Sequence, residues 1–180
     1  MLVLAWAKTI GVAESAMRKA LSEVRVPGRF EKVWNKNGRH VIVDYAHTPD
    51  ALERVLTTAR SLCRGKLSCV FGCGGDRDKT KRPIMGAIAE RIADKAWLTS
   101  DNPRTENPTD IINDVRAGMK TDKFSVVEKR EEAIAKACAE LKDGDWLVIA
   151  GKGHEDYQIV GKTKHHFDDR EEAVKAMEKC

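Results

Sequence analysis

The chain has 180 residues, the length of one ordinary domain with room for a short appendage. Hydrophobic residues make up 42% and charged residues 33% of it, a composition that excludes a disordered chain. The net charge of +4 comes from interspersed basic and acidic residues without a long basic block, which argues against a nucleic-acid-binding protein.

Residues 1–24 carry apolar side chains at helical spacing and are predicted to form a helix. Val26, Pro27 and Gly28 then interrupt the pattern and indicate a domain boundary near residue 25. Beyond this boundary, apolar runs of strand length alternate with helical patterns. The predicted strands cover residues 39–44, 66–72, 95–99, 124–127 and 145–150.

Helices are predicted between these strands. Thr48 can cap the helix after the first strand, and another helix starts near Asn107. Asp168 and Glu171 form a capping-box-like start for the last helix, after a short hairpin over residues 157–167. The alternation predicts an α/β fold: a Rossmann-like, mostly parallel sheet with helices on both faces, a C-terminal β-hairpin and an N-terminal helical appendage.

Polar loops follow four of the predicted strands. They are DYAHTPD at 44–50, GCGGDRDKTKR at 72–82, DNPR at 101–104 and GKGHED at 151–156. Because parallel strands deliver their carboxyl ends to one edge of a sheet, we expect the four loops to converge on one ligand site. The simpler alternative is that each loop is only a turn, although Arg104 adds a guanidinium fork that fits a carboxylate.

Several familiar motifs are absent from the sequence. The chain has no GxxxxGK[ST] phosphate loop, no HExxH, no paired CxxC and no serine in a nucleophile-elbow context. We therefore predict no metal site, no self-contained nucleotide site and no certain catalytic residue.

The five cysteines are odd in number, and their spacing matches no zinc pattern. Buried free thiols in a reducing cytosol are the better interpretation, so we expect a cytoplasmic protein. The apolar run at residues 1–7 ends at Lys8, and no stretch approaches the roughly 18 apolar residues of a membrane span. We expect neither a signal peptide nor insertion into a membrane.

Five segments together resemble the Mur ligases, and among them the members that add diaminopimelate. They are VPGRFE (26–31), VIVDYAHTPDALE (41–53), VFGCGGDRDKTKRP (70–83), TSDNPRTENP (99–108) and AGKGHEDYQ (150–158). The resemblance implies that residues 25–180 are the C-terminal, amino-acid-binding domain. It also implies that residues 1–24 are the terminal helix of a central ATP-binding domain, so the chain is expected to be an engineered or natural fragment.

In the family, ATP activates a carboxyl group as an acyl phosphate, which the amine of the incoming amino acid attacks. The resemblance implies ATP and Mg2+ held mainly by the missing central domain, and a fragment that closes over ATP but is inactive alone. The partners it implies are meso-diaminopimelate and, through the missing domains, UDP-N-acetylmuramoyl-dipeptide. Positions matching residues that hold diaminopimelate are Arg77, Asn102, Arg104, Gly151 and Glu155. Positions matching residues that face ATP are Arg29, Asp44, Tyr45 and His47.

The chemistry of diaminopimelate suits this set of residues. Two arginines and an asparagine can meet carboxylates, and Glu155 can pair with an ammonium group. Lysine-adding relatives typically have DDPR, so Asn102 favours a substrate whose far end bears a carboxylate. Three alternatives remain open: a lysine-adding ligase, a folylpolyglutamate-type ligase, and a stand-alone binding module without catalysis.

Overall fold

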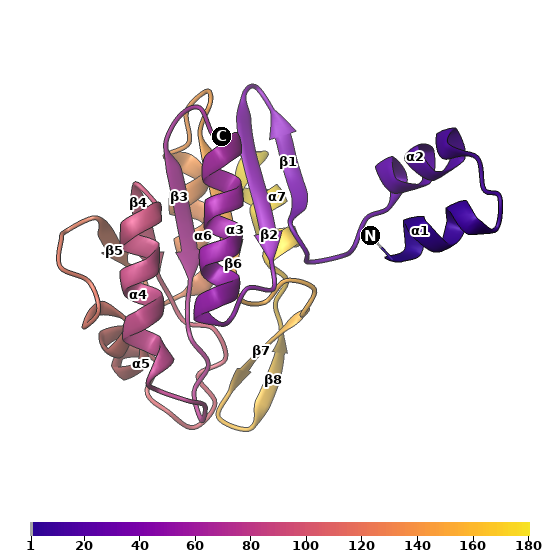
Figure 1. Ribbon diagram of the computed structural model, residues 1–180. Helices are drawn as coiled ribbons and strands as arrows, with labels where there is room; N and C mark the ends of the chain where they lie inside the picture. The colour runs from indigo at the N-terminus through magenta and orange to yellow at the C-terminus, as the bar shows by residue number, and fades with distance from the viewer. Residues whose placement is uncertain (1) are drawn as a thin grey trace.

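Figure 1 shows the computed structural model, which describes residues 2–180. The main sheet has the strand order β1-β2-β6-β3-β4-β5. Its strands are β1 (Glu31–Lys36), β2 (Arg39–Asp44), β3 (Leu67–Phe71), β4 (Lys95–Leu98), β5 (Phe124–Val126) and β6 (Trp146–Ala150). Strand β1 is antiparallel to β2, and all other neighbours are parallel. The predicted mostly parallel sheet is confirmed, as is the hairpin of β7 (Tyr157–Val160) and β8 (Thr163–His166).

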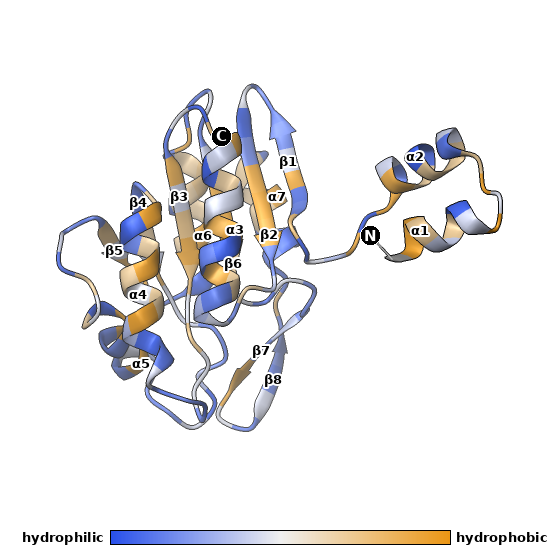
Figure 2. Ribbon diagram, in the orientation of Figure 1, coloured by the Kyte–Doolittle hydropathy of each residue, from blue (hydrophilic) through white to orange (hydrophobic). Residues whose placement is uncertain are grey.

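Helices cover both faces of the sheet (Figure 1). One face carries α3 (Pro49–Leu62), α4 (Lys81–Ile92) and α5 (Pro108–Arg116), and the other carries α6 (Arg130–Ala139) and α7 (Asp169–Met177). Successive strand residues point to opposite faces, so Val148 packs in the first core and Leu147 and Ile149 in the second. Figure 2 shows the resulting apolar central strands.

Side-chain caps begin three of the helices at the predicted residues. A backbone N–H group of the first turn donates to Thr48 at 3.4 Å, to Asn107 at 2.9 Å and to Asp168 at 2.8 Å. The carboxylate of Glu171 does not complete a capping box in this arrangement, because it lies 2.9 Å from Nε2 of His166. These caps place the helix starts directly beside the loops that follow the strands.

The N-terminal segment differs from the prediction of one helix over residues 1–24. It forms α1 (Leu2–Thr9) and α2 (Glu14–Glu23). Gly11 lies between them with φ of +79°, a left-handed conformation that ends a helix and that glycine adopts without strain. Both helices lie apart from the sheet in Figure 1. Their assignment to a neighbouring domain remains a prediction.

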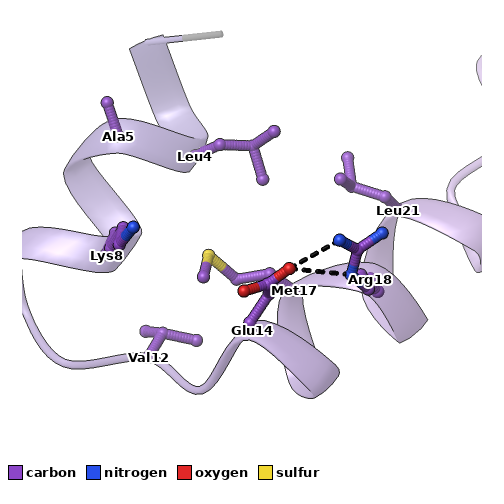
Figure 3. A pocket seen from close by; sticks show the side chains of 8 residues that line it. All are labelled: Leu4, Ala5, Lys8, Val12, Glu14, Met17, Arg18 and Leu21. Carbon is purple, nitrogen blue, oxygen red and sulfur yellow. Dashed lines mark hydrogen bonds and ion pairs between the residues drawn. The ribbon is translucent and has the colours of Figure 1, made fainter.

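An apolar groove runs between α1 and α2. Leu4, Met17 and Leu21 line it, beside the ion pair of Glu14 and Arg18 (Figure 3). Large apolar side chains such as Trp6, which is 64% exposed, also lie on the surface of these helices. Among the described residues, no helix is both long and apolar enough to cross a membrane.

Strand β1 was not predicted. Its sequence, EKVWNK, is mostly polar, and it pairs with β2 at the edge of the sheet. The connecting residues Asn37 and Gly38 both have positive φ, 52° and 65°, as expected for a tight hairpin turn. The Asn-Gly pair was therefore a visible signal for this hairpin, and the prediction overlooked it.

Candidate functional site

The predicted convergence of the four loops is observed. Strands β2, β6, β3 and β4 are neighbours in the sheet, and the loops at their carboxyl ends enclose a cavity of ≈ 400 Å³. The lining residues are Tyr45, His47, Thr48, Gly72, Cys73, Gly74, Arg77, Lys81, Asp101, Asn102, Arg104, Gly151, Glu155 and Tyr157. All five residues predicted to hold the amino acid are among them. The topology thus gathers side chains separated by more than a hundred positions in the sequence.

Asn102 is one of the residues that line the cavity and is 5% exposed. Its Oδ1 accepts hydrogen bonds from Nζ of Lys152 at 3.0 Å and from the N–H of Ile159 at 2.9 Å. Its Nδ2 donates to Oε2 of Glu155 at 3.2 Å. The amide therefore presents an N–H donor to the cavity beside a carboxylate.

Glu155 also connects to Tyr45 across the cavity. The hydroxyl of Tyr45 donates to Oε1 of Glu155 at 3.4 Å, and burial, then the Glu155 carboxylate, raise the pKa of Tyr45. The guanidinium carbon of Arg29 lies 4.6 Å from the centre of the Tyr45 ring, and the rings of Tyr45 and His47 pack edge to face with their centres 4.6 Å apart. One contact network therefore joins the expected ATP side to the expected amino-acid side.

Arg104 is held by its backbone and by one end of its guanidinium. Its N–H donates to the carbonyl of Ile159 at 3.1 Å, and its Nη1 donates to the carbonyl of Gly75 at 2.8 Å. Its φ of +52° is left-handed, a conformation that is uncommon for residues other than glycine. The contacts at Nη1 leave the other edge of the fork available for a carboxylate.

The loop after β3 packs closely against the loop after β4. A side chain at Gly72 would collide with the carbonyl of Thr99, and one at Gly75 with the carbonyl of Pro103. Glycine at these two positions thus allows the backbones of the two loops to pack closely. Arg77 is exposed, its Nη1 donates to the carbonyl of Asp76 at 3.0 Å, and its side chain lines the cavity.

Arg82 anchors the same loop from within and is 0% exposed. It donates to both carboxylate oxygens of Glu106 at 3.0 and 2.9 Å, to Asp114 at 2.9 Å and to the carbonyl of Gly74 at 3.2 Å. Glu106 also accepts from the N–H of Asp76 at 2.6 Å. These hydrogen bonds, Arg82 first, lower the pKa of Glu106 to about 2.

The depressed pKa of Glu106 predicts a loss of stability in acid. Glu106 contributes stability above its unfolded pKa near 4.5, and this contribution is lost as the pH falls toward about 2. Glu106→Gln should therefore be less stable than wild type at pH 7, with a smaller difference at pH 2–3. Urea unfolding across this pH range measures it, with exposed Glu178→Gln as the control. A constant difference would contradict the assignment.

The residues expected to face ATP divide into two groups. Tyr45 and His47 line the cavity, whereas Arg29 and Asp44 do not. Asp44 has a structural contact, because its Oδ2 accepts from the N–H of Phe30 at 2.7 Å. It thereby fixes the segment that follows the Val26-Pro27-Gly28 boundary. Facing ATP remains a prediction for all four residues.

Like Arg82, two further buried cations near the site were missed by the sequence analysis. Lys152 and Arg130 are 0% and 1% exposed. Arg130 makes two hydrogen bonds of 2.7 Å to the carboxylate of Asp169 and donates to the carbonyl of Ala150 at 3.0 Å. Arg130 thus holds the last residue of β6, which directly precedes Gly151. Lys152 was visible within GKGHED, but its burial is a tertiary property.

Comparison with known families gives a match over residues 28–153 to the model described as "Mur ligase, glutamate ligase domain". This segment contains β1 to β6, three complete loops of the cavity wall and the first three residues of the fourth loop, 151–153. The chain belongs to the Mur ligase family. The resemblance based on five short segments is confirmed.

Curated relatives carry a more specific name. The chain is 56% identical over 156 residues to a UDP-N-acetylmuramoyl-L-alanyl-D-glutamate–2,6-diaminopimelate ligase of Clostridioides difficile, covering 86% of this chain and 32% of that protein. It is 53% identical over 178 residues to the ligase of the same name from Thermosynechococcus vestitus, covering 97% and 36%. This Mur ligase chain thus spans about a third of the length of these relatives.

Solved structures of Mur ligases also match this chain. A structure of a diaminopimelate ligase of this name matches with a TM-score of 0.82 and 40% identity over 98% of this chain and 37% of its own. A Thermotoga maritima UDP-N-acetylmuramate-alanine ligase matches with a TM-score of 0.62 at 20% identity, covering 98% and 35%, which shows the fold alone.

Proposed function

We propose that this chain is the amino-acid-holding domain of a ligase. The ligase joins meso-diaminopimelate to UDP-N-acetylmuramoyl-L-alanyl-D-glutamate with ATP in peptidoglycan synthesis. The observation that carries the proposal is the cavity that brings Arg77, Asn102, Arg104 and Glu155 together. The names of the relatives, at 53–56% identity, support the same substrate. The free cysteines, three of them buried, suit the reducing cytoplasm in which we place the reaction.

The charges of the cavity match the charges of diaminopimelate. Each end of this amino acid bears a carboxylate and an ammonium group. Arg77 and Arg104 supply guanidinium groups for carboxylates, Asn102 supplies a neutral N–H donor, and Glu155 supplies a carboxylate for an ammonium. Held at its far end in this way, the ligand leaves its other amine free for reaction.

The residues of this chain bind and orient the ligand. In the reaction that the family implies, the free amine bonds to the activated acyl carbon and phosphate leaves. A fixed position for the amine lowers the entropy cost of this step. Within residues 2–180, no group of three or more His, Cys, Asp or Glu side chains could hold a metal ion. We assign ATP and Mg2+ mainly to the central domain of the ligase, and UDP-N-acetylmuramoyl-dipeptide to the parts outside this chain.

A lysine-adding ligase is the main alternative. The far end of lysine bears only an ammonium, which Glu155 could bind but which offers nothing to the guanidinium groups of Arg77 and Arg104. The neutral amide of Asn102 lies 3.2 Å from Glu155. An aspartate at this position would place two carboxylates side by side, and these would repel a carboxylate at the far end of the ligand. Asparagine therefore favours diaminopimelate. The alternative of a stand-alone binding module predicts the same cavity without any ligation.

Amino-acid choice is the test of this proposal. A complete ligase carrying this domain should use meso-diaminopimelate with a kcat/KM roughly 10³-fold or more above that for L-lysine, because lysine has no carboxylate at its far end to pair with the guanidinium groups of Arg77 and Arg104. ATP-dependent amide formation by each amino acid measures this ratio. The isolated chain, assayed in parallel, should neither hydrolyse ATP nor form the amide. Equal kcat/KM values for lysine and meso-diaminopimelate, or amide formation by the isolated chain, would contradict the proposal.

A further inference from the structure

Lys152 lies inside the wall of the cavity and does not line it. The side chain is 0% exposed. Its Nζ lies 2.9 Å from Oδ1 of Asp101, 3.0 Å from Oδ1 of Asn102 and 2.8 Å from the carbonyl oxygen of Tyr157. Two of the three N–H donors of the ammonium are hydrogen-bonded, one to Asn102 and one to the carbonyl of Tyr157, and the contact with Asp101 is an ion pair. The charge is compensated by Asp101, as burial of an ammonium requires.

These contacts decide which way the amide of Asn102 faces. Nζ of Lys152 and the N–H of Ile159 both donate to its Oδ1, and a carboxylate oxygen of Glu155 lies beside its Nδ2. The reverse orientation would set Nδ2 against two donors and the amide oxygen against a carboxylate. Only one orientation therefore satisfies all three partners.

We propose that Lys152 is a positioning residue for the amino-acid site. It holds Oδ1 of Asn102 inside the wall, so that Nδ2 faces the cavity as a hydrogen-bond donor. Lys152 acts through Asn102 and does not touch the ligand. The role concerns the same site as the proposed function and rests on it for the identity of the ligand.

The position of Lys152 also joins three segments that contribute residues to the cavity. Its own loop follows β6, Asp101 and Asn102 follow β4, and Tyr157 begins β7. A purely structural role would require these bonds only for stability. The positioning role requires in addition that the donor of Asn102 changes direction when Lys152 is replaced.

The first experiment reads this donor directly by NMR on the 180-residue chain. In wild type, the Nδ2 protons of Asn102 should exchange slowly with solvent and show contacts to Glu155. Lys152→Met, which keeps the length and removes the donors, should shift these signals and remove the contacts. Lys162→Met, an exposed substitution in the β7–β8 turn, should leave them unchanged. Unchanged Asn102 signals in Lys152→Met would overturn the proposal.

The second experiment measures binding of meso-diaminopimelate by titration calorimetry. Misplacing one donor should weaken binding by roughly ten- to a hundredfold in Lys152→Met, while Lys162→Met binds as wild type does. A loss of stability with unchanged affinity of the folded chain would indicate a structural role and overturn the proposal. If Lys152→Met does not fold, Lys152→Met with Asp101→Asn removes both buried charges and takes its place.

The two experiments test separately the proposed ligand of the cavity and the proposed positioning role of Lys152. Absence of meso-diaminopimelate binding by the wild-type chain would count against the ligand assignment. In that case, the Asn102 signals still decide whether Lys152 orients the amide.

Discussion

Replacing Arg104 with alanine in the complete ligase is expected to lower kcat/KM for meso-diaminopimelate by roughly 30-fold or more. Loss of one partner of a desolvated charge pair costs roughly 2–5 kcal/mol, and each ~1.4 kcal/mol is about tenfold. The apparent KM for the UDP-sugar substrate should change little. Steady-state kinetics with each substrate varied in turn measures the effect.

Two variants test whether Arg104 acts through its guanidinium. Arg104→Lys keeps the charge but loses the planar fork, so it should also be impaired. Arg64→Ala removes an exposed arginine that precedes β3 at the other edge of the sheet, and it should behave as wild type. An Arg104→Ala enzyme that keeps its kcat/KM and still rejects lysine would remove Arg104 from the site.

Replacing Arg130 with methionine is expected to destabilise this chain by about 3–5 kcal/mol, because the change leaves the fully buried carboxylate of Asp169 without its partner. In a chain of this length, such a loss corresponds to a decrease of roughly 6–20 °C in Tm. Urea unfolding and thermal unfolding of the 180-residue chain measure both quantities.

The neighbouring Lys129 provides the matched control. Its side chain is 69% exposed and pairs with Glu132 on the surface, so Lys129→Met should leave the Tm close to that of wild type. Adding Asp169→Leu to Arg130→Met removes the unpaired charge and should recover much of the stability. A wild-type Tm in Arg130→Met alone would show that the buried pair contributes nothing.

Local patterns were sufficient to predict most of the fold. The apolar runs at 39–44 and 145–150 correspond to β2 and β6, and the capping residues Thr48 and Asn107 begin α3 and α5. These features depend on side-chain alternation and on short-range hydrogen bonds, which the sequence displays directly. Strand β1 depends on pairing with β2 more than on its own composition, so its apolar pattern was too weak to detect.

The site was predictable in its location but not in its supporting contacts. Strand-end loops locate the cavity, because parallel strands share an edge. The buried cations Arg82, Arg130 and Lys152 could not be singled out in the sequence, since burial of a charge depends on partners far along the chain. Glu106, Asp169 and Asn102 are those partners, at separations of 24, 39 and 50 residues.

The position of β6 has a consequence for how the site forms during synthesis. Strand β6 lies between β2 and β3, although it follows both by a long stretch of chain. Until residues 146–150 leave the ribosome, β2 and β3 have no common neighbour, and the loops after them have no fixed separation. Such long-range pairing is slow, and its unpaired strand edges are prone to aggregation. A nascent chain stalled before residue 146 should therefore expose two open strand edges and should need protection by chaperones until β6 inserts.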